Sequence, residues 1–252
     1  MDVTAVLRSN CTDERIGALL DAGKVADALW EIAREQRFAH VLGGEERRRA
    51  MLQIGKGEKG RLFSDLEDFV IDEYLHLLRD GAPPDVHVFD CDMSRLAVQS
   101  VQGSSEAVEM LSVCLRSALA VMNVALIPLH LSGIESDVPH WVLVRIERTP
   151  SSFSMHTLDS AVQLMHENPH AVAEKHALLN QIASVLDVPP SRALGQWRGW
   201  PSVPQQCNNT DCGIFMLEFV RLLVSGKVPN PKTLGGDMRR RMTLELAERW
   251  IL

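Results

Sequence analysis

Several features that would place the chain in a familiar class are missing from its 252 residues. The five cysteines, an odd number without regular spacing, do not form a disulfide framework and are typical of a reducing compartment. There is no apolar run of about 18 residues and no charged start followed by an apolar stretch, so neither a membrane span nor a standard secretion signal is indicated. A net charge of -7 disfavours general nucleic-acid binding. These absences predict an intracellular protein of the cytoplasm or nucleus.

The most apolar stretch of the chain, residues 214–224, contains only Glu218 and Arg221 as polar side chains and begins two residues after Cys212. This pattern predicts a buried helix that begins at Cys212. The positive end of a helix dipole favours a thiolate, so the position indicates a nucleophile. A cysteine that only packs the top of a core helix is the alternative that this position leaves open.

A thiolate nucleophile needs a base, and the base needs an acceptor that orients it. His140 and Asp159 fit these roles best, because an apolar segment follows His140, a second candidate strand ends at Asp159, and a short turn-like segment joins the two. A hairpin that pairs Glu147 with Ser152 sets His140 directly opposite Asp159, about 5 Å apart at the β-carbons. An ordinary strand-end histidine and an ordinary turn aspartate are the alternative for this pair.

Gln206 lies in a polar loop shortly before Cys212. Its side-chain amide is placed to donate to the oxyanion of a tetrahedral intermediate, beside the backbone amide of Cys212. Taken alone, a glutamine in such a loop is ordinarily solvated.

The sequence around these residues resembles that of the Ulp and SENP group of cysteine proteases, which process or remove SUMO and related ubiquitin-like modifiers. The resemblance spans residues 61–252 and is most specific at Pro139-His140-Trp141, Leu158-Asp159-Ser160 and Pro-Gln-Gln-Cys-Asn-Asn-Thr-Asp-Cys-Gly, residues 204–213. It implies an α+β, papain-like clan CE fold with a central mixed sheet and a nucleophile at the N-terminus of a buried helix. No cofactor and no metal are implied.

The resemblance also implies a division of roles among the matching positions. Cys212 is expected to be the nucleophile, His140 the general base, Asp159 its orienting acid and Gln206 the oxyanion donor.

Three further residues are assigned to substrate binding. Trp141 matches the Trp that covers the narrow tunnel occupied by the modifier's C-terminal Gly-Gly in this family. Asp65 stands where a second tunnel Trp is usual, so that side of the groove is expected to be built differently. Asp211, directly before the nucleophile, is the third.

Glycines and alternating charges in residues 55–60 predict a boundary between two regions. A helical N-terminal accessory region is expected over 1–60 and the catalytic domain over 61–252. The basic run 239–241 is typical of a solvated helix face or of a contact with an acidic partner surface, and neither role is assigned to it. Apolar spacing predicts helices over 13–37 (two, interrupted at 22–24), 45–54, 69–78, 107–120 and 169–186, and strands over 86–89 and 124–131.

The leading hypothesis is a thiol isopeptidase or peptidase that cleaves after the Gly-Gly terminus of a ubiquitin-like modifier, with SUMO favoured and ubiquitin or another modifier as alternatives. A divergent or bacterial-effector-type member, which would act inside a host cell, is consistent with the departure at Asp65. Two rival functions stay open: acetyl transfer of the YopJ type from acetyl coenzyme A, and binding of a ubiquitin-like protein without catalysis.

Overall fold

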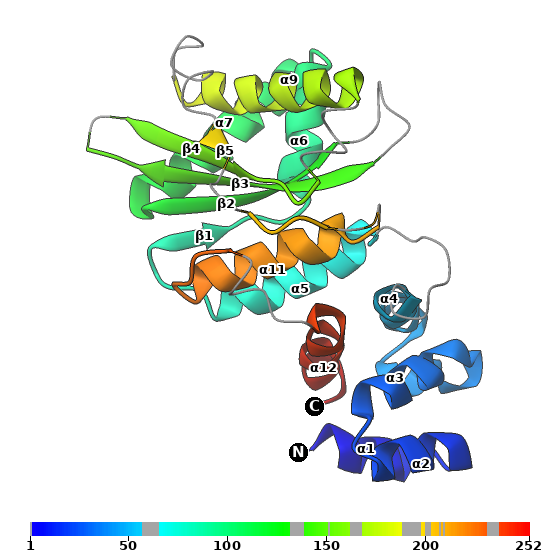
Figure 1. Ribbon diagram of the computed structural model, residues 1–252. Helices are drawn as coiled ribbons and strands as arrows, with labels where there is room; N and C mark the ends of the chain where they lie inside the picture. The colour runs from blue at the N-terminus through cyan, green and yellow to red at the C-terminus, as the bar shows by residue number, and fades with distance from the viewer. Residues whose placement is uncertain are drawn as a thin grey trace. The chain divides into compact units, whose positions relative to one another are not determined.

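The computed structural model, drawn in Figure 1, describes residues 2–56, 66–131, 139–150, 152–161, 168–187, 198–199, 203–206, 208, 210–230 and 237–252. The chain forms two compact units. Unit 1 comprises Met1–Leu77 and Gly235–Leu252, and unit 2 comprises Leu78–Leu234. The boundaries between these units differ from the predicted boundary at residue 60. The division into units does not test which part of the chain carries activity, so the accessory role of residues 1–60 stays a prediction.

Unit 1 joins the two ends of the chain in one helical assembly. The indole Nε1 of Trp30 donates to Thr243 Oγ1 at 2.9 Å, and Arg239 donates to the carbonyl of Ile54 at 2.7 Å. The described helices of this unit are α1 (Val3–Asn10), α2 (Glu14–Asp21), α3 (Val25–Arg34), the 3-10 helix η1 (Gln36–Leu42), α4 (Glu45–Lys56), most of α5 (Asp68–Asp80) and α12 (Met238–Ile251).

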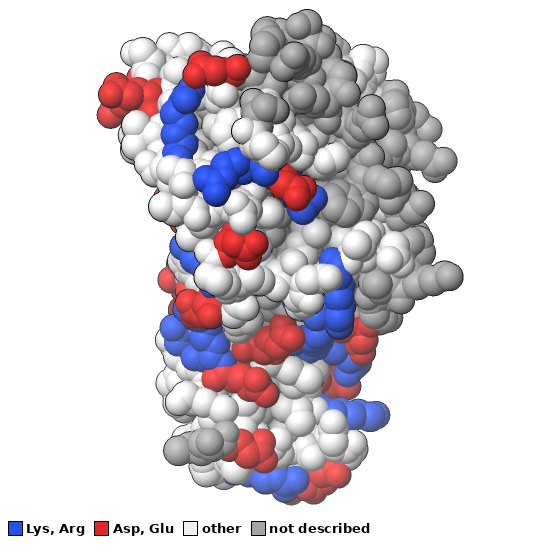
Figure 2. Space-filling model, turned by 90° about the vertical axis from the view of Figure 1, so that its left-hand side faces the viewer, with Lys and Arg blue, Asp and Glu red and all other residues white. Residues whose placement is uncertain are grey.

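Several charged side chains of unit 1 form ion pairs with side chains of opposite sign. Arg15 meets Glu35 at 2.6 Å, and Arg240 of α12 meets Asp27 at 3.0 Å. Figure 2 shows basic and acidic side chains interspersed over one face of the molecule. Within the basic run 239–241, Arg239 does not lie on a solvated face, because it is 7% exposed and its guanidinium donates to the backbone carbonyls of Gln53 and Ile54 in α4.

Unit 2 is built on a mixed sheet. Within the described residues, five strands lie in the order β1-β2-β3-β4-β5. The β1–β2 and β4–β5 pairs are parallel, and the β2–β3 and β3–β4 pairs are antiparallel. The strands are β1 (Val86–Val88), β2 (Val124–Leu131), β3 (His140–Arg148), β4 (Phe153–Leu158) and β5 (Arg198–Gly199).

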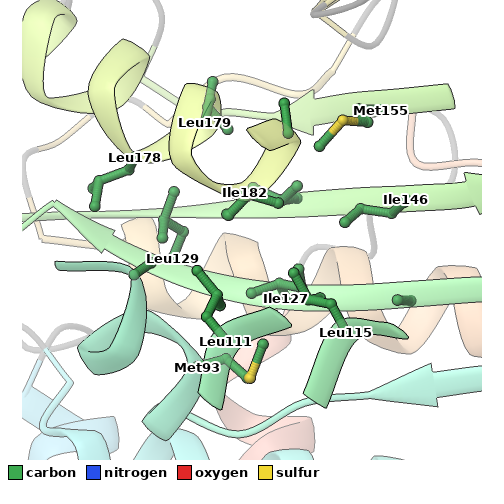
Figure 3. Packing of buried hydrophobic residues seen from close by; sticks show 14 of the residues in the cluster. Met93, Leu111, Leu115, Ile127, Leu129, Ile146, Met155, Leu178, Leu179 and Ile182 are labelled. Atoms are coloured by element: carbon green, nitrogen blue, oxygen red, sulfur yellow. The ribbon is translucent and has the colours of Figure 1, made fainter. Parts of the chain in front are cut away.

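Helices pack on both faces of this sheet. Helices α6 (Asp92–Val101), α7 (Ser105–Val121) and α9 (Pro169–Val185) cover one face, and α11 (Cys212–Val224) lies on the other (Figure 1). Because both faces of β2 and β3 are buried, their sequences are almost continuously apolar rather than alternating. Figure 3 shows the core beneath the three helices, with Met93, Leu111, Leu115, Ile127, Leu129, Ile146, Met155, Leu178, Leu179 and Ile182 in mutual packing.

Helix α11 is buried along most of its length, and its single acidic residue is neutralised locally. Glu218 is 2% exposed and accepts two hydrogen bonds from Arg221, at 2.7 and 2.8 Å. A bidentate pair one turn apart lets an otherwise apolar helix be buried without an isolated charge. The helix is thereby a fixed support for its first residue, Cys212.

Most expected elements are confirmed, including α2 and α3 with their break at Gly23, which adopts a φ of 69°. The α+β class with a mixed sheet is confirmed as well. Helices α1, α6, η1 and α12 and the short strand β5 are not among the expected elements. In α6 the polar residues Ser94, Gln99 and Ser100 interrupt the apolar spacing on which the expectation relied.

Candidate active site

Cys212 is the first residue of α11 and is 1% exposed. The loop before it is fixed by Asn208, whose side-chain oxygen accepts from the backbone N–H groups of Thr210 and Asp211, each at 2.9 Å. The carbonyl of Asp211 then accepts the first helical hydrogen bond, from Phe215 at 2.8 Å. The thiol is therefore held at the positive end of a buried helix dipole, as the sequence predicts.

His140 opens β3, and Asp159 follows directly after β4. The His140 Nε2 and Asp159 Oδ1 atoms lie 2.8 Å apart, and the two residues are 4% and 3% exposed. His140 also shares a side-chain hydrogen bond with Cys212. Since Nε2 is engaged by the carboxylate, Nδ1 is the ring nitrogen left for the thiol. The structure thus brings together the three residues that the sequence proposes as nucleophile, base and orienting acid.

The predicted hairpin register is wrong by two residues, however. Glu147 pairs with Ser154 rather than Ser152, and the β3–β4 ladder ends where Leu143 meets Leu158. The cause is the turn, in which the Thr149 N–H and hydroxyl both donate to the Ser152 carbonyl at 2.8 Å. A slip of two preserves the face on which each side chain lies. His140 and Asp159 therefore still meet, although they are not directly opposite in the ladder.

The electrostatics of the pair favour the charged forms of both groups. Burial by itself lowers the pKa of His140, but hydrogen bonds to Asp159 and Cys212, together with the negative charges of both, raise it to about 9. Burial by itself raises the pKa of Asp159, but the hydrogen bond from His140 and the positive charge of Lys175 hold it well below its usual range. At neutral pH the site holds an imidazolium beside a carboxylate.

Asp159 has partners that the sequence argument missed. Lys175 Nζ of α9 lies 2.5 Å from Oδ2, the Ala161 N–H donates to Oδ1 at 2.9 Å, and the Gln205 amide donates to the backbone carbonyl of Asp159 at 2.9 Å. A signal for Lys175 was present, because Ala171 and Leu179 lie four residues on either side of it, on one face of a helix. A lysine within an apolar face indicates a buried acidic partner.

Gln206 is hydrogen-bonded to Ser160, the residue that follows Asp159. Its backbone N–H donates to the Ser160 carbonyl at 2.8 Å, and its side-chain oxygen accepts from the Ser160 hydroxyl at 2.7 Å. Its side-chain nitrogen donates to the carbonyl of Asn208 at 2.6 Å. Because a carbonyl can only accept, this contact fixes which end of the amide faces Asn208. The amide is thus oriented by the loop that leads to the nucleophile.

The model of the Ulp1 protease family, C-terminal catalytic domain, matches residues 65–249. This chain belongs to the Ulp1 protease family. It is therefore a cysteine protease. No curated protein matches the chain significantly.

Solved structures support the fold of this Ulp1-family chain. The Xanthomonas campestris effector XopD bound to ubiquitin shares 17% identity over 73% of this chain and 91% of its own, with a TM-score of 0.54. The yeast Ulp1 protease domain in complex with Smt3 shares 15% identity over 81% of each chain, with a TM-score of 0.54. The SUMO protease Ulp1 with its catalytic cysteine oxidised to a sulfonic acid shares 13% identity over 81% of this chain and 83% of its own, with a TM-score of 0.53. The predicted clan CE fold is confirmed.

Of the three residues assigned to substrate binding in this Ulp1-family chain, the structure describes Trp141 and Asp211. Trp141 is 2% exposed, and its ring centroid lies 4.6 Å from that of His130. The Asp211 carboxylate accepts from the Asn208 amide at 2.8 Å, which gives it a place in the loop before Cys212. Asp65 lies outside the described residues. The binding roles of these three residues stay predictions.

The described part of the chain contains neither a candidate metal site nor a candidate membrane-spanning helix. No group of three or more His, Cys, Asp or Glu residues there is arranged to hold a metal ion. None of the described helices combines the length and apolar character needed to cross a membrane.

Proposed function

We propose that the chain is a thiol isopeptidase or peptidase that cleaves after the C-terminal Gly-Gly of a ubiquitin-like modifier, with SUMO as the favoured modifier. The observation that carries the proposal is the hydrogen-bonded line from Cys212 through His140 to Asp159, at the start of a buried helix. A buried imidazolium held between a thiol and a carboxylate is the arrangement that activates a cysteine for acyl transfer.

In the acylation step, the Cys212 thiolate attacks the carbonyl carbon of the modifier's last glycine and forms a C–S bond. The C–N bond to the lysine amine breaks, and the proton of the His140 imidazolium passes to the leaving nitrogen. Asp159 keeps the imidazole oriented and stabilises its charged form. The products of this step are a free amine and an acyl-enzyme on Cys212.

In the deacylation step, neutral His140 takes a proton from water, and the oxygen attacks the thioester carbon. The C–S bond breaks, which releases the modifier as a carboxylic acid and restores the thiolate beside the imidazolium. The acid then loses its remaining proton to solvent.

The tetrahedral intermediates of both steps carry a negative oxygen that needs donors. The backbone N–H of Cys212 lies in the first turn of α11, where N–H groups lack helical acceptors. The amide nitrogen of Gln206 carries two hydrogens, of which one is given to Asn208. Its second hydrogen and the Cys212 N–H supply the two donors expected of an oxyanion hole.

Structural relatives support a ubiquitin-like modifier as the substrate class. XopD is bound to ubiquitin, and yeast Ulp1 is in complex with Smt3, the yeast ortholog of SUMO. Only glycine lacks the β-carbon that would collide with the walls of a narrow tunnel, so a Gly-Gly terminus suits a site covered by Trp141.

The proposal is tested with C-terminal electrophilic probes built on SUMO, ubiquitin and other ubiquitin-like modifiers. Wild-type protein is expected to gain the mass of one probe, Cys212→Ala to gain none, and Cys114→Ala, a change at a partly exposed cysteine in α7, to behave as wild type. Absence of any adduct would refute the proposal. Transfer of a labelled acetyl group from acetyl coenzyme A would then indicate acetyl transfer, and binding of a modifier without turnover would indicate a binder.

A further inference from the structure

Lys175 is an unusual residue for its position in α9. Its neighbours on the same helix face, Ala171, Leu178 and Leu179, are each at most 2% exposed. Only 16% of the Lys175 side chain is exposed, and its Nζ lies 2.5 Å from Asp159 Oδ2. Placing a lysine on a buried stripe is unfavourable unless its charge is compensated, and here the compensation is the same carboxylate that binds His140.

The two oxygens of the Asp159 carboxylate bind different partners. Oδ1 accepts from His140 Nε2 at 2.8 Å and from the Ala161 N–H at 2.9 Å, so that oxygen is held even without the lysine. Oδ2 is engaged by Lys175. His140 of β3 and Lys175 of α9 are the titratable groups that lower the pKa of Asp159, and Cys212 of α11 interacts in turn with His140. One negative charge therefore faces two positive ones.

We propose that Lys175 is a positioning residue of this site, which acts through Asp159 by binding Oδ2 and taking up part of the carboxylate's charge. The proposal rests on the proposed function, because it concerns the same reaction. A carboxylate shared with a lysine stabilises the imidazolium less than an unshared one does. His140 is thereby kept acidic enough to protonate a departing amine, which is the demanding step when the leaving group is a lysine side chain.

The first test titrates His140 by NMR in the free enzyme and needs no modifier. Lys175→Met and Lys175→Gln, of which the second keeps a hydrogen-bond donor without the charge, are expected to raise the pKa of His140 by about one unit. Lys175→Arg is expected to restore the wild-type value. Lys227→Met, a change at an exposed lysine beyond the other end of α11, is the matched control.

The second test compares leaving groups on the same modifier. The two charge-removing variants are expected to slow isopeptide cleavage about three- to tenfold, and to leave cleavage of a thioester within about twofold of wild type, because a thiolate departs without a proton. Lys175→Arg is expected to match wild type on both substrates.

The proposal would be overturned if the pKa of His140 in Lys175→Met and Lys175→Gln equals the wild-type value. It would also be overturned if the two variants lose the same fraction of their cleavage rate on the isopeptide and the thioester. If Lys175→Met does not fold, Lys175→Gln decides the question. If wild-type protein cleaves no modifier, the proposed function fails by itself, while the His140 titration still tests the role of Lys175.

Discussion

At the scale of single residues, the charge on His140 depends on the thiol beside it as well as on Asp159. The hydrogen bond to Cys212 and the negative charge of its thiolate both raise the pKa of His140. We therefore expect Cys212→Ala to lower this pKa below the value of about 9 in the wild-type protein. Histidine-selective NMR titration of both proteins measures the change. An unaltered His140 titration in Cys212→Ala would mean that the thiol and the imidazole do not interact.

A second residue, Ser160, orients the proposed oxyanion donor. Its hydroxyl donates to the Gln206 side-chain oxygen at 2.7 Å, so Ser160→Ala removes one of the contacts that fix the amide. We expect kcat to fall about tenfold with KM nearly unchanged, because an oxyanion contact is made in the transition state. Ser184→Ala, at an exposed serine of α9, is the control and is expected to keep wild-type kinetics. A rise in KM alone would place Ser160 in substrate binding instead.

At the scale of elements, the β3–β4 turn determines how the two strands that carry His140 and Asp159 are paired. The Thr149 hydroxyl donates to the Ser152 carbonyl at 2.8 Å and accepts from the Ser152 N–H at 3.0 Å. We expect Thr149→Ala to reduce the free energy of unfolding by about 1 kcal/mol, and Thr149→Ser to retain it. Urea denaturation measures both. Equal loss in the two variants would mean that the hydroxyl does not stabilise the turn.

This turn also shows where prediction from the sequence succeeds and where it fails. The apolar run after Cys212 gave the buried helix, and the strand patterns brought His140 and Asp159 to one end of the hairpin. Strand patterns alone determine the face of each side chain, whereas the pairing depends on turn hydrogen bonds that composition does not reveal. Lys175 was missed for a related reason, since its partner is supplied by tertiary packing rather than by nearby sequence.

At the scale of the whole molecule, unit 1 depends on contacts between the first and last parts of the chain. Thr243 is fully buried, accepts from the Trp30 indole and donates to the Arg239 carbonyl at 2.8 Å. Thr243→Val keeps the shape but leaves the indole N–H without this acceptor, so we expect a loss of about 2 kcal/mol in the free energy of unfolding. Thr243→Ser is expected to lose much less. Thermal unfolding that is unchanged in Thr243→Val would show that this hydrogen bond is not stabilising.

The central claim is that Cys212 and His140 cleave an isopeptide bond after a Gly-Gly terminus. In the most direct measurement, SUMO and ubiquitin, each joined to a peptide lysine, are incubated with wild-type protein, Cys212→Ala or His140→Gln. The masses of the products are then determined by mass spectrometry. We predict that wild-type protein releases an intact modifier ending in Gly-Gly together with the unmodified lysine peptide, and that neither variant does. Release at the wild-type rate by Cys212→Ala, or no release from any modifier by wild-type protein, would contradict the account.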